Sequence, residues 1–273
     1  TGTRAGARGG VTTVIDFAIP YTGDSLNDAA DNWMKKAEGK ALIDYTFHIC
    51  ITRWNEHKDQ IEGMVKRGFT TFKEFMIYES EGWQSDDRAL YGTLEKMREY
   101  GTMLLVHAES ARVLDELIAR HHTPELMKQY GARLHPITRP NFVEAEAIQR
   151  VVQWCEATGG KLYIVHMSTG EGADIVRAAQ ARGVPVIAET CAQYLVLDDS
   201  VFADAERFRP LIEQSSETGI CRTVPSVRIT ERSRKFSSSR IFPGQCHCSR
   251  ACMASSGIVA MCLFIRCANF ATK

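Results

Sequence analysis

The feature that most constrains the fold is a strict alternation between β-rich runs and helical segments. Six runs rich in β-branched and aromatic residues have the length of buried strands. The strands are expected at residues 11–17, 44–51, 70–77, 102–107, 161–166 and 184–190, and the helices at 25–40, 55–67, 87–100, 110–120, 143–158 and 170–182. Short connections between such elements favour parallel strands joined by helices, in either a closed barrel or an open doubly wound sheet.

The composition narrows the class of protein. A hydrophobic fraction of 44% in 273 residues allows one large barrel domain with a sizeable core. The net charge is zero, so we expect neither a nucleic-acid partner nor an anionic membrane surface. The most apolar run, residues 257–265, is far too short to cross a bilayer. We therefore expect a cytoplasmic protein.

The last part of the chain differs from the rest. Only Cys50, Cys155 and Cys191 of the nine cysteines precede residue 211. The group Cys246, His247, Cys248 and Cys252 is a poor match to the paired Cys-x2-Cys spacing of zinc sites. Because no regular period is visible there, residues 210–273 are expected to form an aberrant or disordered tail.

Three side chains that can bind metals follow three of the expected strands. Lys73 lies in TTFKEFMIY, His107 is the fourth residue of LLVHAES, and His166 lies in LYIVHMSTG. Taken singly, a buried lysine more often pairs with a carboxylate, and a histidine at a strand end is more often a hydrogen-bonded core residue. All three at the carboxyl ends of barrel strands would meet at one rim, which indicates a metal site.

Five segments carry a resemblance to a known family, in matching order and spacing: TTFKEFMIY, LLVHAES, HPITRPNFVEAEA, LYIVHMSTGEGADIVRAA and VIAETCAQYLVLD. They resemble the dihydropyrimidinase and D-hydantoinase family of cyclic amidohydrolases, over residues 1–209. The resemblance implies an α/β fold, a TIM-like (β/α)8 barrel of the metal-dependent hydrolase type. Matches cover its second to seventh strands, so residues 1–209 are expected to form an incomplete barrel and the chain to be a fragment.

The resemblance also implies a site and a reaction. It assigns two divalent metals, usually zinc, to the barrel, with Lys73 carbamylated and bridging them and with His107 and His166 as ligands of one metal. An N-carboxylated lysine offers anionic oxygens where an ammonium would repel cations. Tyr78 matches a tyrosine that hydrogen-bonds the developing oxyanion, although packing at a strand end is its alternative role. The implied reaction is ring opening of a small cyclic amide, dihydropyrimidine or hydantoin, by a metal-activated hydroxide, in a homotetramer.

Other features of the family have no counterpart here. The sequence contains no His-x-His pair and no segment like the family's eighth-strand aspartate, so activity of this chain alone is left open. Allantoinase-type or dihydroorotase-type hydrolysis is one alternative, and a non-catalytic, dihydropyrimidinase-like assembly protein is another. Glu109 beside His107 is expected either to orient that histidine or to cap the next helix.

Overall fold

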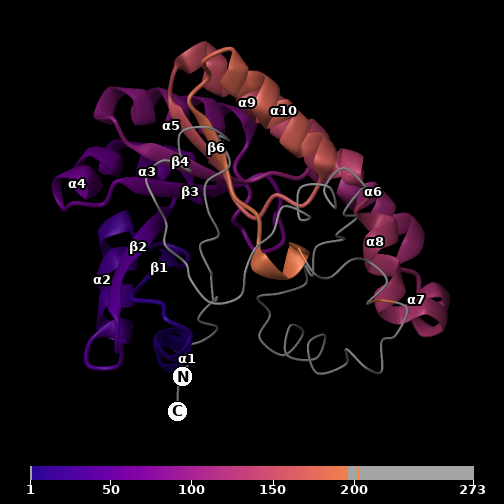
Figure 1. Ribbon diagram of the computed structural model, residues 1–273, viewed down its shortest axis with the longest axis horizontal. Coiled ribbons are helices and arrows are strands. Elements are labelled where there is room, and N and C mark those ends of the chain that lie inside the picture. The colour runs from indigo at the N-terminus through magenta and orange to yellow at the C-terminus, as the bar shows by residue number, and fades with distance from the viewer. Residues whose placement is uncertain (1, 196–201, 203–273) are drawn as a thin grey trace.

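Six parallel strands form one sheet in which each strand lies beside its neighbour in the sequence. The computed structural model describes residues 2–195 and 202 (Figure 1). The strands are β1 (Thr13–Ala18), β2 (Asp44–Cys50), β3 (Thr71–Phe75), β4 (Met103–His107), β5 (Lys161–Ile164) and β6 (Val186–Ala188). A doubly wound sheet reverses its strand order at a switch point, whereas a (β/α) barrel keeps the strands in sequence. The observed order is therefore that of a barrel.

Helices connect the strands and run around the outside of the curved sheet (Figure 1). They are α1 (Gly2–Arg8), α2 (Leu26–Ala37), α3 (Trp54–His57), α4 (Ile61–Lys66), α5 (Asp87–Tyr100), α6 (Ala111–His121), α7 (Pro124–Tyr130), α8 (Leu134–Thr138), α9 (Asn141–Thr158) and α10 (Gly170–Ala181). Three 3₁₀ turns lie at Lys58–Gln60, Gly131–Arg133 and Ala192–Leu195. Within the described part of the chain, no helix is long and apolar enough to cross a membrane.

Local sequence explains where several helices begin and end. Ser25 caps α2 through a reciprocal capping box with Asp28. Asp86 caps α5, which ends at Gly101 with a left-handed φ of 68°. Gly159 ends α9 in the same way, with φ 72°, because glycine adopts this conformation without a steric penalty.

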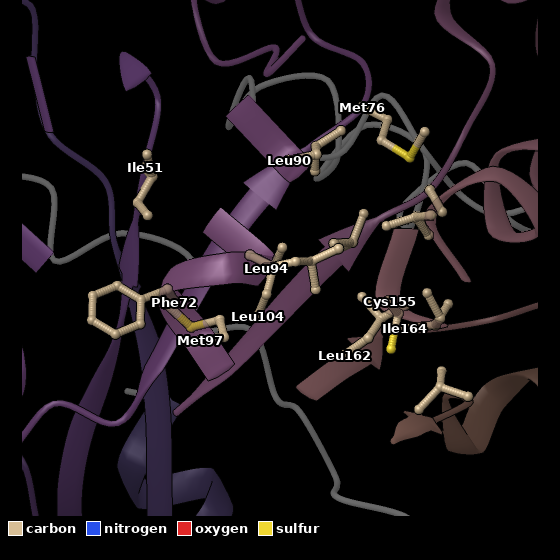
Figure 2. Close-up of a cluster of buried hydrophobic side chains, with 14 of the residues drawn as sticks. Ile51, Phe72, Met76, Leu90, Leu94, Met97, Leu104, Cys155, Leu162 and Ile164 are labelled. Carbon is tan, nitrogen blue, oxygen red and sulfur yellow. The ribbon is translucent and has the colours of Figure 1, made fainter. Parts of the chain in front are cut away.

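The two faces of the sheet have different roles. Side chains alternate along a strand, so Phe72 and Glu74 point one way from β3 while Lys73 and Phe75 point the other way. The first face packs against the helices: the hydroxyl of Thr93 on α5 donates to Glu74 at 3.0 Å. Figure 2 shows the apolar core on this face, with Phe72, Met76, Leu90, Leu94, Met97, Leu104, Cys155, Leu162 and Ile164 among the labelled side chains. The opposite face, which carries Lys73, is turned toward the interior of the barrel.

The structure differs from the sequence prediction in several places, including the ends of most strands and helices. Residues 121–140, where no helix or strand was predicted, contain α7 and α8. Helix α7 begins there because Thr123 accepts a hydrogen bond from Leu126 N and Pro124 suits the first helical turn. The helix expected at 55–67 is divided by a 3₁₀ turn. The strand expected at 161–166 ends at Ile164, two residues before His166. The predicted tail at 210–273 lies outside the described residues.

Candidate metal centre

Two histidines meet at the carboxyl ends of β4 and β5. His107 is the last residue of β4, and His166 follows the end of β5 by two residues. The distance between His107 Nδ1 and His166 Nε2 is 3.0 Å. Two imidazole nitrogens bound to one tetrahedral zinc ion at about 2.0–2.1 Å lie about 3.3 Å apart. The two nitrogens therefore lie within hydrogen-bonding distance, and slightly closer than two ligands of one such ion.

Glu109 fixes the orientation of the His107 ring. Its carboxylate accepts a hydrogen bond of 2.7 Å from His107 Nε2, and Arg139 Nε lies 3.5 Å from its other oxygen. Because Nε2 carries the proton, Nδ1 presents a lone pair, which accepts a hydrogen bond from Nε2–H of His166. A carboxylate behind a histidine ligand holds the ring in the tautomer that a metal requires. Of the two roles expected for Glu109, the geometry matches the orienting one.

Burial and the neighbouring charges set the ionisation of this pair. Burial lowers the pKa of His107, and the Lys73 and Arg139 charges lower it further, against the opposing effect of Glu109. Burial alone would raise the pKa of Glu109, but its hydrogen bond to His107 and the charges of His107, Arg139 and His135 bring that pKa below its ordinary value. Glu109 is thus ionised and His107 neutral at pH 7, and only neutral imidazole binds a metal.

Lys73 lies on β3, the strand that pairs with the His107 strand β4. In the β3–β4 register Lys73 is opposite Leu105, two residues before His107. Its side chain is 2% exposed, and Nζ donates to the Glu74 carbonyl at 2.8 Å and lies 4.1 Å from the centre of the Phe75 ring. The structure therefore places Lys73 on the barrel interior, with its charge close enough to act on His107.

Tyr78 reaches the same histidine from the loop after β3. The centre of its ring lies 5.1 Å from that of His107, and the His107 and His166 ring centres are 4.7 Å apart. Tyr78 and His166 have φ values of 75° and 41°, and they are the non-glycine residues with positive φ in the described part of the chain. Such backbone is sterically unfavourable and concentrates at functional sites.

The sequence did not single out Glu144 or Arg139. Glu144 lies on α9 and accepts hydrogen bonds from the backbone of Ser168 and Thr169, next to His166. Both residues lie in the family-like HPITRPNFVEAEA segment, but nothing local in the sequence shows that it packs against the two histidines.

Burial raises the pKa of Glu189, which directly follows β6 and accepts a hydrogen bond of 2.9 Å from Tyr163 Oη.

The donors present fit one metal ion. His107 and His166 supply two neutral nitrogens, and Lys73 would supply an oxygen ligand once carboxylated. No group of three or more His, Cys, Asp and Glu side chains suited to a metal occurs among residues 2–195 and 202. Among the described residues, these side chains are therefore too few to form a complete site for two metal ions.

Comparison with known proteins identifies relatives of this barrel. D-hydantoinase of Geobacillus stearothermophilus is 40% identical over 208 residues, which cover 73% of this chain and 42% of the relative. D-hydantoinase of Streptomyces coelicolor is 36% identical over 211 residues, 76% of this chain and 44% of the relative. No family model matches the chain.

Solved structures match in the same way. A D-hydantoinase structure superposes with a TM-score of 0.75 at 32% identity, covering 86% of this chain and 49% of that one. Dihydropyrimidinase from Brevibacillus agri gives a TM-score of 0.68 at 36% identity, covering 73% and 43%. The chain thus spans less than half the length of the relatives it matches. Over this matched region, the chain belongs to the D-hydantoinase and dihydropyrimidinase family and has the fold of its (β/α) barrel.

Proposed function

We propose that this chain carries part of the active site of a metal-dependent hydrolase that opens the ring of cyclic amides, of the dihydropyrimidine or hydantoin type. The observation that carries the proposal is the His107–His166 pair, whose facing nitrogens are 3.0 Å apart at the carboxyl end of a barrel. Active sites of (β/α) barrels lie at that end. The similarity to D-hydantoinases and to a dihydropyrimidinase supports the substrate class.

Each residue has a distinct role in this proposal. His107 Nδ1 and His166 Nε2 would hold the ion, with the His166 proton on Nδ1 in the bound state, and Glu109 would keep the His107 proton on Nε2. A divalent ion, zinc by family expectation, would lower the pKa of a water molecule and polarise the amide carbonyl. Tyr78, beside His107, would donate its hydroxyl proton in a hydrogen bond to the oxyanion that develops on the substrate carbonyl.

Lys73 would act as a ligand only after modification. The ammonium loses one proton, the neutral Nζ forms a bond to the carbon of CO2, and a second proton leaves to give an N-carboxylate. Burial favours the neutral amine that this reaction requires, because desolvation penalises the ammonium, and bound cations would stabilise the anionic product. The Lys73 side chain is 2% exposed and its positive charge acts on His48, His107 and Glu189, so its conversion to an anion would also change the electrostatics of the whole site.

Groups beyond the described residues are needed to complete the reaction. Apart from Lys73, which would bridge both ions once carboxylated, we propose no ligand of a second ion and no proton donor to the leaving nitrogen among positions 2–195 and 202. The family homotetramer is the setting we propose for turnover. The alternative, a non-catalytic assembly protein, is disfavoured by the presence of Lys73, His107 and His166, because a scaffold has no need of a carbamylated lysine or of metal ligands.

Metal content measured by elemental analysis tests the proposal and separates it from this alternative. The full chain is purified from medium containing Zn²⁺ and bicarbonate, alongside His107→Ala, Lys73→Met and, as a matched control, His121→Ala on the surface helix α6. We expect zinc in the unmodified chain and in the control, a loss in both site variants, and a dependence on bicarbonate that Lys73→Met abolishes. Zinc retained in His107→Ala, or absent from the unmodified chain, would overturn the proposed centre.

Hydrolysis of dihydrouracil and of hydantoin is then followed with the same four proteins. Turnover that His107→Ala and Lys73→Met both abolish would establish the cyclic-amide substrate class. Zinc binding without turnover of either compound would assign the metal centre but reject hydrolysis by this chain alone.

A further inference from the structure

The loop that carries His166 is held in an unusual backbone conformation. His166 has φ 41°, in the left-handed region that non-glycine residues seldom adopt. The regular strand β5 has already ended at Ile164, so sheet hydrogen bonds do not by themselves set the direction of the His166 side chain. Other contacts must hold this bend, since strained backbone persists where its surroundings over-determine it.

The sheet side of the loop is anchored by β4 and β6. Val165 N donates to Val106 O at 3.3 Å, and Met167 N donates to Glu189 O at 2.7 Å. The Glu189 side chain also accepts a hydrogen bond from the His166 backbone. These contacts hold residues 165–167 against the sheet. They do not hold residues 168 and 169, which connect the loop to α10.

Glu144 holds these two residues. Its Oε1 accepts from Ser168 N at 3.0 Å and from Ser168 Oγ at 3.2 Å, and its Oε2 accepts from Thr169 N at 2.8 Å. Thr169 is the N-cap of α10, so the carboxylate also lies at the positive end of that helix. One side chain from α9 thereby fixes two consecutive residues immediately after Met167.

We infer that Glu144 is a positioning residue: by clamping Ser168 and Thr169 it holds His166 in its left-handed conformation and sets Nε2 against His107 Nδ1. This inference rests on the proposed function, because it assigns Glu144 to the geometry of the same metal pair. Glu144 acts through the backbone N–H groups of Ser168 and Thr169. Second-sphere carboxylates that orient ligands typically change metal affinity by about 10- to 100-fold when removed.

The substitution Glu144→Gln tests the clamp with almost no change in size. Both oxygens of Glu144 face N–H donors, so a glutamine must turn its NH2 group against either Ser168 N–H or Thr169 N–H. Glu156→Gln is the matched control, since Glu156 lies on the same helix and forms an exposed ion pair with Arg182. Ser168→Ala is a milder variant, which removes the hydroxyl donor and keeps both backbone donors.

The first readout is Co²⁺ affinity of the full chain, measured by titration in the visible spectrum well below the unfolding temperature. We expect Glu144→Gln to weaken binding about 10-fold or more, Ser168→Ala about twofold to threefold, and Glu156→Gln not at all. The second readout needs no metal: in ¹⁵N spectra of the histidine rings, Glu144→Gln should shift the His166 and His107 signals and leave those of His57 unchanged.

The outcomes separate the two proposals. If His107→Ala and His166→Ala bind Co²⁺ as the unmodified chain does, the proposed metal centre fails. If those variants lose binding but Glu144→Gln keeps full affinity and unshifted histidine signals while its unfolding temperature falls, Glu144 is only structural and the inference is overturned. If Glu144→Gln does not fold, unchanged affinity and unchanged ring signals in Ser168→Ala would overturn it instead.

Discussion

Replacement of Glu109 by glutamine is the sharpest test of how the His107 ring is prepared for a metal. Glu109 receives a hydrogen bond of 2.7 Å from His107 Nε2 on one oxygen, and Arg139 Nε lies 3.5 Å from the other. Both oxygens therefore face donors, and a glutamine has to turn its NH2 group toward one of them. In one orientation the NH2 faces Nε2 and favours the tautomer with the proton on Nδ1, which removes the lone pair directed at His166.

The magnitude follows from the interaction that is lost. A hydrogen bond to a charged group contributes about 1.5–3 kcal/mol, and 1.36 kcal/mol corresponds to a factor of 10 in an equilibrium constant. We therefore expect Glu109→Gln to weaken Co²⁺ or Zn²⁺ binding by about 10- to 100-fold. Glu79→Gln, which breaks a solvent-exposed pair with Arg112, serves as the control and should leave affinity unchanged.

The assay combines a metal competition titration with ¹⁵N spectra of the histidine rings. The unmodified chain should show His107 with its proton on Nε2, and Glu109→Gln should populate the other tautomer. If Glu109→Gln binds metal as tightly as the unmodified chain and keeps the same tautomer, Glu109 does not orient His107, and the site as described here is wrong.

Three further predictions concern stability, each measured by urea unfolding of the full chain. Burial lowers the pKa of His48 to about 4, so below about pH 6.5 the unfolded state binds a proton that the folded state does not. Between pH 7 and pH 5 the free energy of unfolding of the unmodified chain should therefore fall by about 2 kcal/mol more than that of His48→Gln. Equal dependence of the unfolding free energy on pH in the two proteins would contradict this. A Cβ at Gly160 would clash with the Leu94 carbonyl oxygen, so Gly160→Ala should lower the free energy of unfolding by at least about 2–3 kcal/mol. Gly63→Ala is the control: this glycine lies in a helix with open space around it, and the substitution should stabilise the fold by about 0.4–1 kcal/mol. Similar values for the two variants would refute the clash. Ser25→Ala removes the cap of α2 and should cost about 1 kcal/mol, and no loss would mean that the capping box contributes nothing.

The sequence predicted those parts of the fold whose cause is local. The expected helix at 87–100 matches α5, because Asp86 supplies a capping side chain and Gly101 a left-handed stop. The barrel order could not be distinguished from a doubly wound sheet by alternation alone, since strand order depends on which edges pair. The register in which Phe75 lies opposite His107 confirms the parallel arrangement of β3 and β4.

The candidate site was predicted only at the level of residue types and strand ends. His107 and His166 do lie together, while the roles of Lys73 and Tyr78 stay predictions. Glu144 lies 24 and 25 positions before Ser168 and Thr169 in the sequence. No local sequence pattern predicts a contact between residues so far apart. The left-handed backbone at His166 could not be predicted either, because the apolar run favoured a strand through that position.

The positions of the strained residues give an argument for function that does not depend on similarity to other proteins. Within residues 2–195 and 202, positive φ at a non-glycine residue occurs at Tyr78 and His166, and both rings lie within 5.1 Å of the His107 ring, centre to centre. Each follows the end of a strand closely, Tyr78 after Phe75 and His166 after Ile164. Glycine would make either bend at no steric cost if only the turn mattered. The chain instead places an aromatic hydroxyl and an imidazole there, so what the strained backbone secures is the direction of these two side chains, toward His107.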